Sequence, residues 1–179
     1  MTEGHHAQLR SRIAHLKQEL AHLRQELRTS DVSAGQDAFE VLICRVGARR
    51  VAFRQSEVER VVLAAQLAEL PGAPPWVAGV LNCAGDLVPV ADLMAWFEQR
   101  PRLLESSDAI VICSIDERRL GLVVEEAIDL DTICGGVLRP VTNDVADIPF
   151  VLGVVPEDDG ALLILSAAMV IEQLETTVA

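Results

Sequence analysis

The fold is decided by the stretch Pro71-Gly72-Ala73-Pro74-Pro75-Trp76-Val77-Ala78-Gly79-Val80-Leu81-Asn82. Proline fixes φ and has no backbone N–H, so the first five residues of this stretch end any regular element that precedes them. The apolar run from Trp76 to Leu81 then predicts a strand. Gly79 inside that run indicates a positive φ or a close approach of another backbone. A strand that begins directly after a proline break is typical of a chain built from short β elements.

Outward from this stretch, the chain consists of short apolar runs separated by turn signals. The other predicted strands are Phe39 to Val46, Val51 to Phe53, Leu87 to Val90, Ala109 to Ile115, Leu120 to Val124, Ile128 to Ile133, Phe150 to Val155 and Leu162 to Leu165. Short helices are expected at Ser56 to Val62, Leu93 to Phe97 and Ser166 to Leu174. Many short strands with helices only at the joints favour a mainly β fold of small barrels over a doubly wound sheet.

The N-terminal segment, residues 1–29, carries a heptad pattern that predicts a coiled-coil α-helix. The seam consists of Leu9, Ile13, Leu16, Leu20, Leu23 and Leu27. A helix from Leu9 to Leu27 is about 28 Å long and is marginal alone in water. The seam is therefore covered by its own domain, by a second copy or by a partner helix, and these three alternatives stay open. Residues 30–37 are small and polar and read as a linker.

The charge of the chain excludes several classes of partner. The formal net charge is −12, whereas nucleic-acid affinity depends on Lys and Arg that displace counterions. Acidic membrane surfaces are disfavoured for the same reason, and no apolar run approaches the roughly 20 residues that span a bilayer. The N-terminal residues lack the apolar segment of a secretory signal. We expect a cytoplasmic protein that binds neither nucleic acid nor membrane.

The residues give no support for catalysis. No histidine follows residue 22, no tyrosine is present, and no phosphate-binding glycine motif occurs. Carboxylates cluster at Glu125-Glu126, Asp129-Asp131 and Glu157-Asp158-Asp159, where a solvated edge is a simpler interpretation than a cation site. The widely spaced cysteines are interpreted as small buried hydrophobic residues. We assign no catalytic, cofactor-binding or metal-binding residue, and a binding module is favoured over an enzyme.

Four motifs together resemble the CheW family. They are the opening stretch, Gly85 to Leu93, Leu120 to Glu125, and Phe150 to Val154 with the following Leu162 to Leu165. The resemblance covers residues 38–175 and implies two interlocked, five-stranded, SH3-like barrels. It also implies a non-enzymatic cytoplasmic adaptor without cofactors, which couples chemoreceptor tips to the regulatory domain of a histidine kinase or binds other CheW-like modules.

One motif departs from the family pattern. Where the family has Asn-Leu-Arg-Gly, this chain has Asn82-Cys83-Ala84-Gly85, so the arginine at the receptor-binding groove is missing. Loss of a charged hydrogen bond at an interface costs about 2–5 kcal/mol, and alanine cannot replace the guanidinium fork. By matching positions, the resemblance implies a protein-binding groove at Val58, Gly79, Asn82, Ala84 and Leu130.

Two functions follow from this departure. The first is an adaptor for a kinase regulatory domain, whose more apolar groove accepts a hydrophobic helix from a receptor, the kinase or another partner. The second is a divergent scaffold that no longer couples receptors and instead recruits a polarity or motility factor.

Overall fold

The computed structural model describes residues 38–64, 67–99, 102–141, 148–158 and 160–178. The predicted heptad helix and its linker lie outside these residues. The strands are β1 (Ala38–Val46), β2 (Arg49–Arg54), β3 (Val58–Leu63), β4 (Val77–Cys83), β5 (Asp86–Asp92), β6 (Ala109–Ile115), β7 (Arg118–Val124), β8 (Glu126–Cys134), β9 (Val151–Glu157) and β10 (Gly160–Leu165). The helices are α2 (Leu93–Glu98) and α3 (Ala167–Val178), with 3-10 turns η1 (Gln55–Glu57) and η2 (Gly135–Val137).

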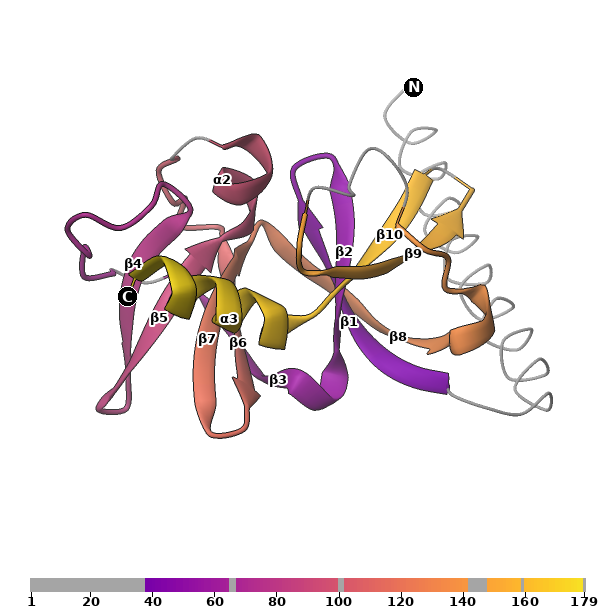
Figure 1. The fold of residues 1–179 in the computed structure, drawn as a ribbon, viewed down its shortest axis with the longest axis horizontal. Helices are drawn as coiled ribbons and strands as arrows, with labels where there is room; N and C mark the ends of the chain where they lie inside the picture. Colours follow the sequence, from indigo (N-terminus) through magenta and orange to yellow (C-terminus); the bar gives the residue numbers. More distant parts are fainter. Residues whose placement is uncertain (1–37, 65–66, 100–101, 142–147, 159, 179) are drawn as a thin grey trace, which may run out of the picture. The chain divides into compact units, whose positions relative to one another are not determined.

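The strands form two five-stranded mixed sheets, which confirms the predicted mainly β class. Sheet A has the order β8-β1-β2-β10-β9 and sheet B has the order β3-β6-β7-β5-β4. Each sheet contains one parallel pair, β2 with β10 in sheet A and β5 with β7 in sheet B. Figure 1 shows sheet A to the right and sheet B to the left.

The two halves of the described chain have the same topology and exchange strands. The first half gives β1 and β2 to sheet A and β3 to β5 to sheet B; the second half gives β6 and β7 to sheet B and β8 to β10 to sheet A. A short repeat marks equivalent positions in the two halves. Four positions are identical and a fifth is aromatic in both of its copies, Pro75-Trp76-Val77-Ala78-Gly79-Val80 and Pro149-Phe150-Val151-Leu152-Gly153-Val154. Neither sheet can therefore form from one half of the chain alone.

In the part of the chain that the structure describes, one isolated bridge joins the two edges of each sheet and closes it into a small barrel. In sheet B the chain after β3 pairs at Ala68 with Val80 of β4, and in sheet A the chain after β8 pairs at Arg139 with Val154 of β9. Each bridge has two backbone hydrogen bonds of 2.8 or 2.9 Å. Gly79 has φ of +139°, and a Cβ there would lie 2.5 Å from the Ala68 carbonyl oxygen. The glycine therefore permits the close approach that the sequence indicated.

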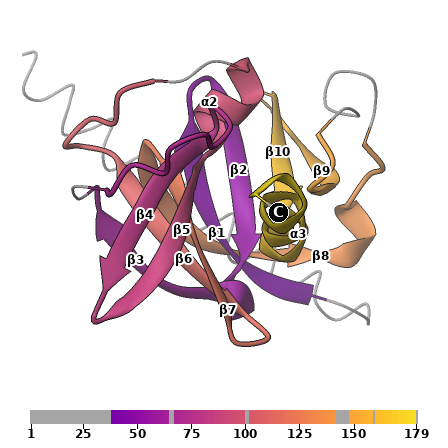
Figure 2. The ribbon, with the colours of Figure 1, turned by 60° about the vertical axis from the view of Figure 1, so that its left-hand side comes forward.

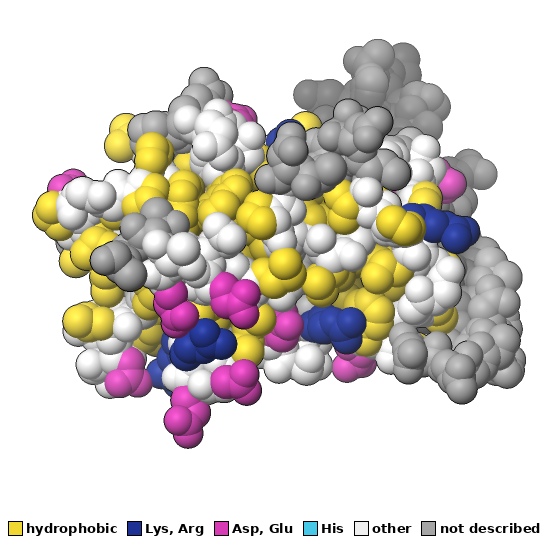
Figure 3. Space-filling view, viewed as in Figure 1, with side chains coloured by type: hydrophobic (Ala, Val, Ile, Leu, Met, Phe, Trp, Pro, Cys, Tyr) yellow, Lys and Arg dark blue, Asp and Glu magenta, His cyan; other side chains and the backbone are white. Residues whose placement is uncertain are grey.

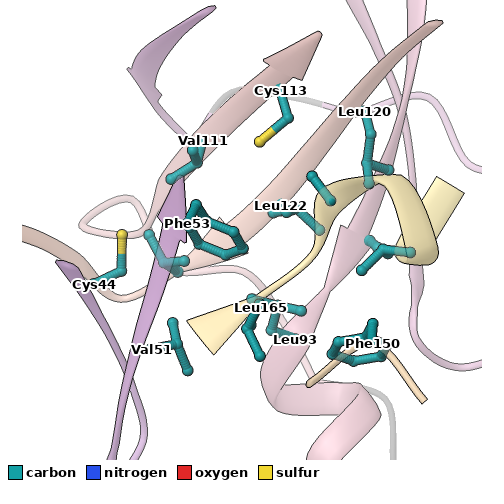
Figure 4. Close-up of a cluster of buried hydrophobic side chains, with 14 of the residues drawn as sticks. Cys44, Val51, Phe53, Leu93, Val111, Cys113, Leu120, Leu122, Phe150 and Leu165 are labelled. Atoms are coloured by element: carbon teal, nitrogen blue, oxygen red, sulfur yellow. The ribbon is translucent and has the colours of Figure 1, made fainter. Parts of the chain in front are cut away.

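Alternation along the strands divides the buried side chains into three clusters. In β1, Val41 and Ile43 point into barrel A, whereas Leu42 and Cys44 point toward sheet B. A second small cluster fills barrel B. The largest cluster lies between the sheets and contains residues from both, including the ten labelled in Figure 4. Helix α3 follows β10 of sheet A and packs against β6 and β7 of sheet B (Figures 1 and 2), so it joins this shared core.

Three of the four cysteines are buried, as predicted. Cys44 and Cys113 belong to the shared core and Cys83 to the interior of barrel B, whereas Cys134 is half-buried. Burial raises the pKa of the Cys44 thiol to about 12, and burial first, with the charge of Glu57 second, raises the pKa of Cys113 to about 12. Both thiols therefore stay protonated at neutral pH and act as apolar core residues.

The predicted helix from Ser56 to Val62 is wrong. Only the 3-10 turn η1 forms, and the chain continues as β3, which pairs with β6. The spacing of Ser56 and Glu59 resembles a helix cap, but the β-branched residues that follow fit a pleated strand. Pairing with β6, far away in the sequence, decides the outcome. The other elements predicted within the described residues occur within a few residues of their expected bounds.

Candidate protein-docking surface

The position at which the family motif has an arginine, Ala84 in this chain, lies in an exposed turn. Ala84 and Gly85 connect β4 to β5 and both have positive φ, 56° and 100°, as in a type I′ hairpin turn. Asn82 Oδ1 accepts a hydrogen bond of 3.0 Å from Gly85 N and so holds the turn closed. The role of Asn82 visible here is therefore to fix the turn, and Ala84 presents a methyl group to solvent.

An arginine from another strand lies against this turn. Arg119 of β7 donates from Nη1 to Asp86 Oδ2 at 2.8 Å, and its Nε lies 2.8 Å from Glu59 Oε2. Its Nη2 donates to Glu59 Oε1 at 3.1 Å. The guanidinium thus ties β3, β5 and β7 together at one end of sheet B. Figure 3 shows basic side chains surrounded by acidic ones at the lower left, over the strand ends of this sheet.

Sequence patterns did not identify Arg119. Its two partners are 33 and 60 residues away in the chain, and only the order of strands in sheet B brings them together. A related pair occurs in sheet A, where Arg50 of β2 is paired with Glu157 of β9. In both sheets an arginine near the start of the second hairpin strand contacts a carboxylate at or beside a hairpin turn, so the arrangement follows the internal duplication.

The five residues predicted to form a groove lie on three strands and one turn. Asn82 and Ala84 share the β4–β5 connection, while Gly79 is buried at the other end of β4 against Ala68. Val58 begins β3 and packs against the shared core. It precedes Glu59, which Arg119 connects to the hairpin. Leu130 lies on β8 in sheet A, in the other half of Figure 1 from the β4–β5 turn. Their joint action as one groove stays a prediction.

Strand β8 carries exposed apolar and acidic side chains in alternation. Ile128 and Leu130 are 44% and 59% exposed, and Asp129 between them is exposed as well. The Oδ1 atoms of Asp129 and Asp131 accept hydrogen bonds of 2.8 Å from the N–H groups of the residues that follow them. Because successive side chains of a strand point to opposite faces, Ile128 and Leu130 lie on one face of this edge strand and Asp129 and Asp131 on the other.

A buried ion network fixes one end of sheet B. Asp92 and Asp108 are almost fully buried, and Arg102 lies between them with Nε 2.8 Å from Asp92 Oδ2 and Nη1 2.8 Å from Asp108 Oδ2. Asp92 Oδ1 also accepts hydrogen bonds from Met94 N and Ala95 N at the start of α2. These contacts hold the chain before β6 against the start of α2.

The carboxylate cluster Glu125-Glu126 is engaged with an arginine. Arg45 lies 3.6 Å from Glu125 and 2.8 Å from Glu126. Within the described ranges, no three His, Cys, Asp or Glu side chains gather in a way that could hold a metal ion. The helices that the structure describes include none that is long and apolar enough to cross a membrane.

Comparisons with known proteins identify the fold and the family. A family model described as the CheW-like domain matches residues 40–175. The probable chemotaxis protein CheW of Rhizobium etli is 20% identical over 149 residues, which is 82% of this chain and 96% of the relative. The chemotaxis protein CheW of Treponema pallidum is 22% identical over 102 residues, 55% of this chain and 60% of the relative.

A solved structure shares the architecture. It is the crystal structure of the scaffolding protein TtCheW from Thermoanaerobacter tengcongensis, with a TM-score of 0.66 and 21% identity over 75% of this chain and 88% of that one. At this identity the likeness supports the fold alone. The family match, in contrast, spans the strands of both sheets and most of the chain. The chain therefore belongs to the family of proteins that carry a CheW-like domain.

Proposed function

We propose that this protein is a non-enzymatic adaptor in chemosensory signalling, which binds the regulatory domain of a histidine kinase in the cytoplasm. The observation that carries the proposal is the family match over residues 40–175. Relatives over this span are named chemotaxis proteins, and the similar solved structure is described as a scaffolding protein. The motifs quoted above led to the same family from the sequence.

The packing supports a function based on surface contacts. Val41, Ile43 and Ile164 are among the side chains that fill barrel A, and Val88 and Ile112 are among those that fill barrel B. Aliphatic side chains contain no acid, base or nucleophile, so they offer no chemistry to a substrate. Partners are therefore expected to bind on the outer surfaces of the barrels, as in an adaptor.

A second candidate function rests on Ala84. Without a guanidinium at this turn, the protein loses the charged contact that the family resemblance places at the receptor groove. A divergent scaffold that recruits a polarity or motility factor would have no need for that contact. The adaptor remains our first proposal, because the family match covers the whole domain whereas the scaffold rests on a single position.

Binding measurements test both functions. The full chain is used to capture the cognate kinase regulatory domain and a soluble receptor tip fragment, and the same assay is repeated with Ala84→Arg. Capture of the kinase domain by both proteins, with receptor binding gained only in the variant, supports the adaptor. If neither fragment binds to either protein, the coupling function is wrong and the scaffold is favoured.

We further propose that residues 1–29 form a dimerising coiled coil, joined by the linker 30–37 to the CheW-like domain at 38–175. The variant Leu16→Asp with Leu23→Asp places two charges in the apolar seam and is expected to reduce the mass seen by light scattering from dimer to monomer. The control, His15→Asp with His22→Asp, adds the same charges at solvent-facing heptad positions and should leave the dimer intact. Equal masses for all three proteins would exclude self-association through the coil.

A further inference from the structure

The described strands form two kinds of ladder, within each half of the domain and between the halves. Within the halves, the hairpins are β1 with β2, β4 with β5, β6 with β7, and β9 with β10. Between the halves, the pairs are β8 with β1, β2 with β10, β3 with β6, and β5 with β7. Every pairing of the second kind can also form between the first half of one chain and the second half of another.

One covalent connection decides which second half a first half pairs with. It runs from the end of α2 at Glu98 to the start of β6 at Ala109. When it folds back, both halves of a domain come from one chain. Fully extended, residues 99–108 span roughly 33 Å, which is about the diameter of a small domain. An extended connection therefore reaches a second copy, and the same strands then pair as in domain swapping.

The ion network around Arg102 closes this connection. Arg102 belongs to the connection, and its Nε lies 2.8 Å from Oδ2 of Asp92, the last residue of β5. Its Nη1 lies 2.8 Å from Oδ2 of Asp108, the residue directly before β6. The carbonyl oxygen of Asp108 also accepts a hydrogen bond of 2.7 Å from Ala64 N, which follows β3. One arginine thus joins the end of the first half to the start of the second.

This contact exists within one chain only when the connection folds back. Arg102 and Asp108 are six positions apart in the sequence, a separation of roughly 20 Å in an extended chain. A tight turn brings them together, in which Glu105 N donates to Asp108 Oδ2 at 2.8 Å and Asp108 N donates to the Glu105 carbonyl oxygen at 3.0 Å. Extension of the connection breaks the turn and the contact together.

The burial of these charges points to a role in specificity. Asp92 and Asp108 are 2% and 3% exposed, so their carboxylates have lost most of their contact with water. Replacement of a buried ion triad by neutral residues is often neutral or stabilising, because desolvation opposes the attraction between the charges. What the network offers beyond stability is a choice between a closed and an extended connection.

We propose that Arg102 is a latch that keeps the two halves of one chain in the same domain, and that the partner it excludes is a second copy of this chain. Without the latch, two chains exchange halves and form a domain-swapped dimer. This inference is independent of the proposed adaptor function, since it concerns which chain supplies the strands and not what the surfaces bind.

Light scattering after refolding tests the latch. All proteins carry Leu16→Asp with Leu23→Asp, so that the proposed coiled coil adds no mass, and each is unfolded in urea and refolded at high concentration. The triple variant Arg102→Met, Asp92→Asn and Asp108→Asn removes the three charges and keeps an amide oxygen as the α2 cap. It should have twice the mass of the parent protein. Asp108→Asn alone, which leaves Arg102 its contact with Asp92, should give a smaller share of dimer.

Arg119→Met is the matched control. Arg119 of β7 also joins the two halves, through Glu59 and Asp86, but it lies outside the connection. This variant should keep the mass of the parent protein. If its mass doubles as well, weaker contact between the halves explains the exchange and the latch is wrong. The inference is also overturned if the triple variant and Asp108→Asn both keep the parent mass, or if the dimer forms on concentration of folded monomer without unfolding.

Mixing of damaged chains tests the exchange itself. Val88→Asp places a charge in barrel B from the first half, and Ile164→Asp places one in barrel A from the second; both positions are 0% exposed. A triple-variant chain with either change should not fold alone, because each barrel needs both halves. Refolded together, the two chains can build one domain from their undamaged halves, and part of the far-UV circular dichroism signal should return. A mixture that gives no more signal than the separate chains would contradict exchange between copies.

Discussion

At the scale of single residues, Asp92 stabilises both a helix start and an ion pair. It caps α2 through Oδ1, pairs with Arg102 through Oδ2, and is 2% exposed. Asp92→Ala removes the cap and leaves the half-buried Arg102 with one carboxylate partner, Asp108. Breaking a buried ion pair costs about 3–5 kcal/mol, so the variant should unfold at a clearly lower urea concentration than the natural protein.

The matched control is Asp86→Ala. Asp86 also pairs with an arginine, Arg119, but its side chain is 72% exposed. Exposed ion pairs contribute about 0–1 kcal/mol, and the control should therefore unfold near the midpoint of the natural protein. Equal loss of stability in the two variants would show that burial does not determine how much these carboxylates contribute to the free energy of unfolding.

Glu57 makes stability depend on pH. Burial raises the pKa of its carboxyl, and the hydrogen bond from Ala167 N and the charge of Arg54 lower it by less. The folded protein therefore keeps this proton at pH values where the unfolded chain has lost it. Stability falls as pH rises from the unfolded pKa through the folded one, because the folded state binds more protons in this interval.

Glu57→Gln removes that titration. The variant should lose less stability than the natural protein between about pH 4.5 and pH 7, when both are unfolded by urea at each pH. If the free energies of unfolding of the two proteins change equally with pH over this interval, Glu57 does not contribute to the pH dependence.

Residue roles were predictable where they depend on neighbours in sequence. Burial of Cys44 and Cys113 follows from their apolar runs, and the close backbone approach at Gly79 follows from a glycine inside a strand. Arg102 and Arg119 were not predicted, because sequence does not show which carboxylates the fold brings to them. Of the five groove residues, the structure explains Asn82 and Gly79 through local geometry, and the binding role of the set stays a prediction.

At the scale of elements, strands with strong alternation were predicted almost to their bounds, and β3 was not. A strand such as β6 carries its own signal, because its residues pack alternately into barrel B and into the shared core. In β3 the polar residues Glu59 and Arg60 interrupt the apolar pattern, and pairing with β6 supplies the missing stabilisation. Strand order and barrel closure could likewise not be predicted from local patterns, because both depend on pairing between strands that are far apart in the sequence.

Closure of barrel B depends on the glycine beside its bridge. In Gly79→Ala the new Cβ would lie 2.5 Å from a carbonyl oxygen, at a φ that side chains rarely adopt. A strained backbone position costs about 1–3 kcal/mol, and the clash adds to it, so we expect a loss of at least about 2 kcal/mol in urea unfolding.

Gly136→Ala is the control for this loss. Its Cβ would have open space around it, and its φ is outside the positive region. Such a substitution is expected to stabilise slightly, by about 0.4–1 kcal/mol, through the unfolded chain. If Gly79→Ala is as stable as Gly136→Ala, the bridge at Ala68 does not hold the barrel closed.

At the scale of the whole CheW-like domain, strand exchange couples the two barrels. Each half of the described chain supplies strands to both sheets, and one cluster of buried side chains contains residues of both. The interlocked arrangement followed from the family resemblance rather than from periodicity, because the repeat at 75–80 and 149–154 is only six residues long. A domain built in this way has no half that can lose its structure while the other keeps its own.

Cooperative unfolding tests this coupling. Ile43→Ala opens a cavity inside barrel A, where Ile43 is 3% exposed, and should cost about 2–5 kcal/mol. Trp76 and Trp96, whose rings are 4.0 Å apart, report by fluorescence from the two segments that flank β4 and β5 of sheet B. Because the halves of the chain exchange strands and the two barrels share one core, the urea midpoint of fluorescence should fall together with that of far-UV circular dichroism. Leu152→Ala, at an exposed position of β9, should move neither midpoint by much. A fluorescence midpoint that stays in place while circular dichroism separates into two steps would mean that the barrels fold independently, despite their exchanged strands.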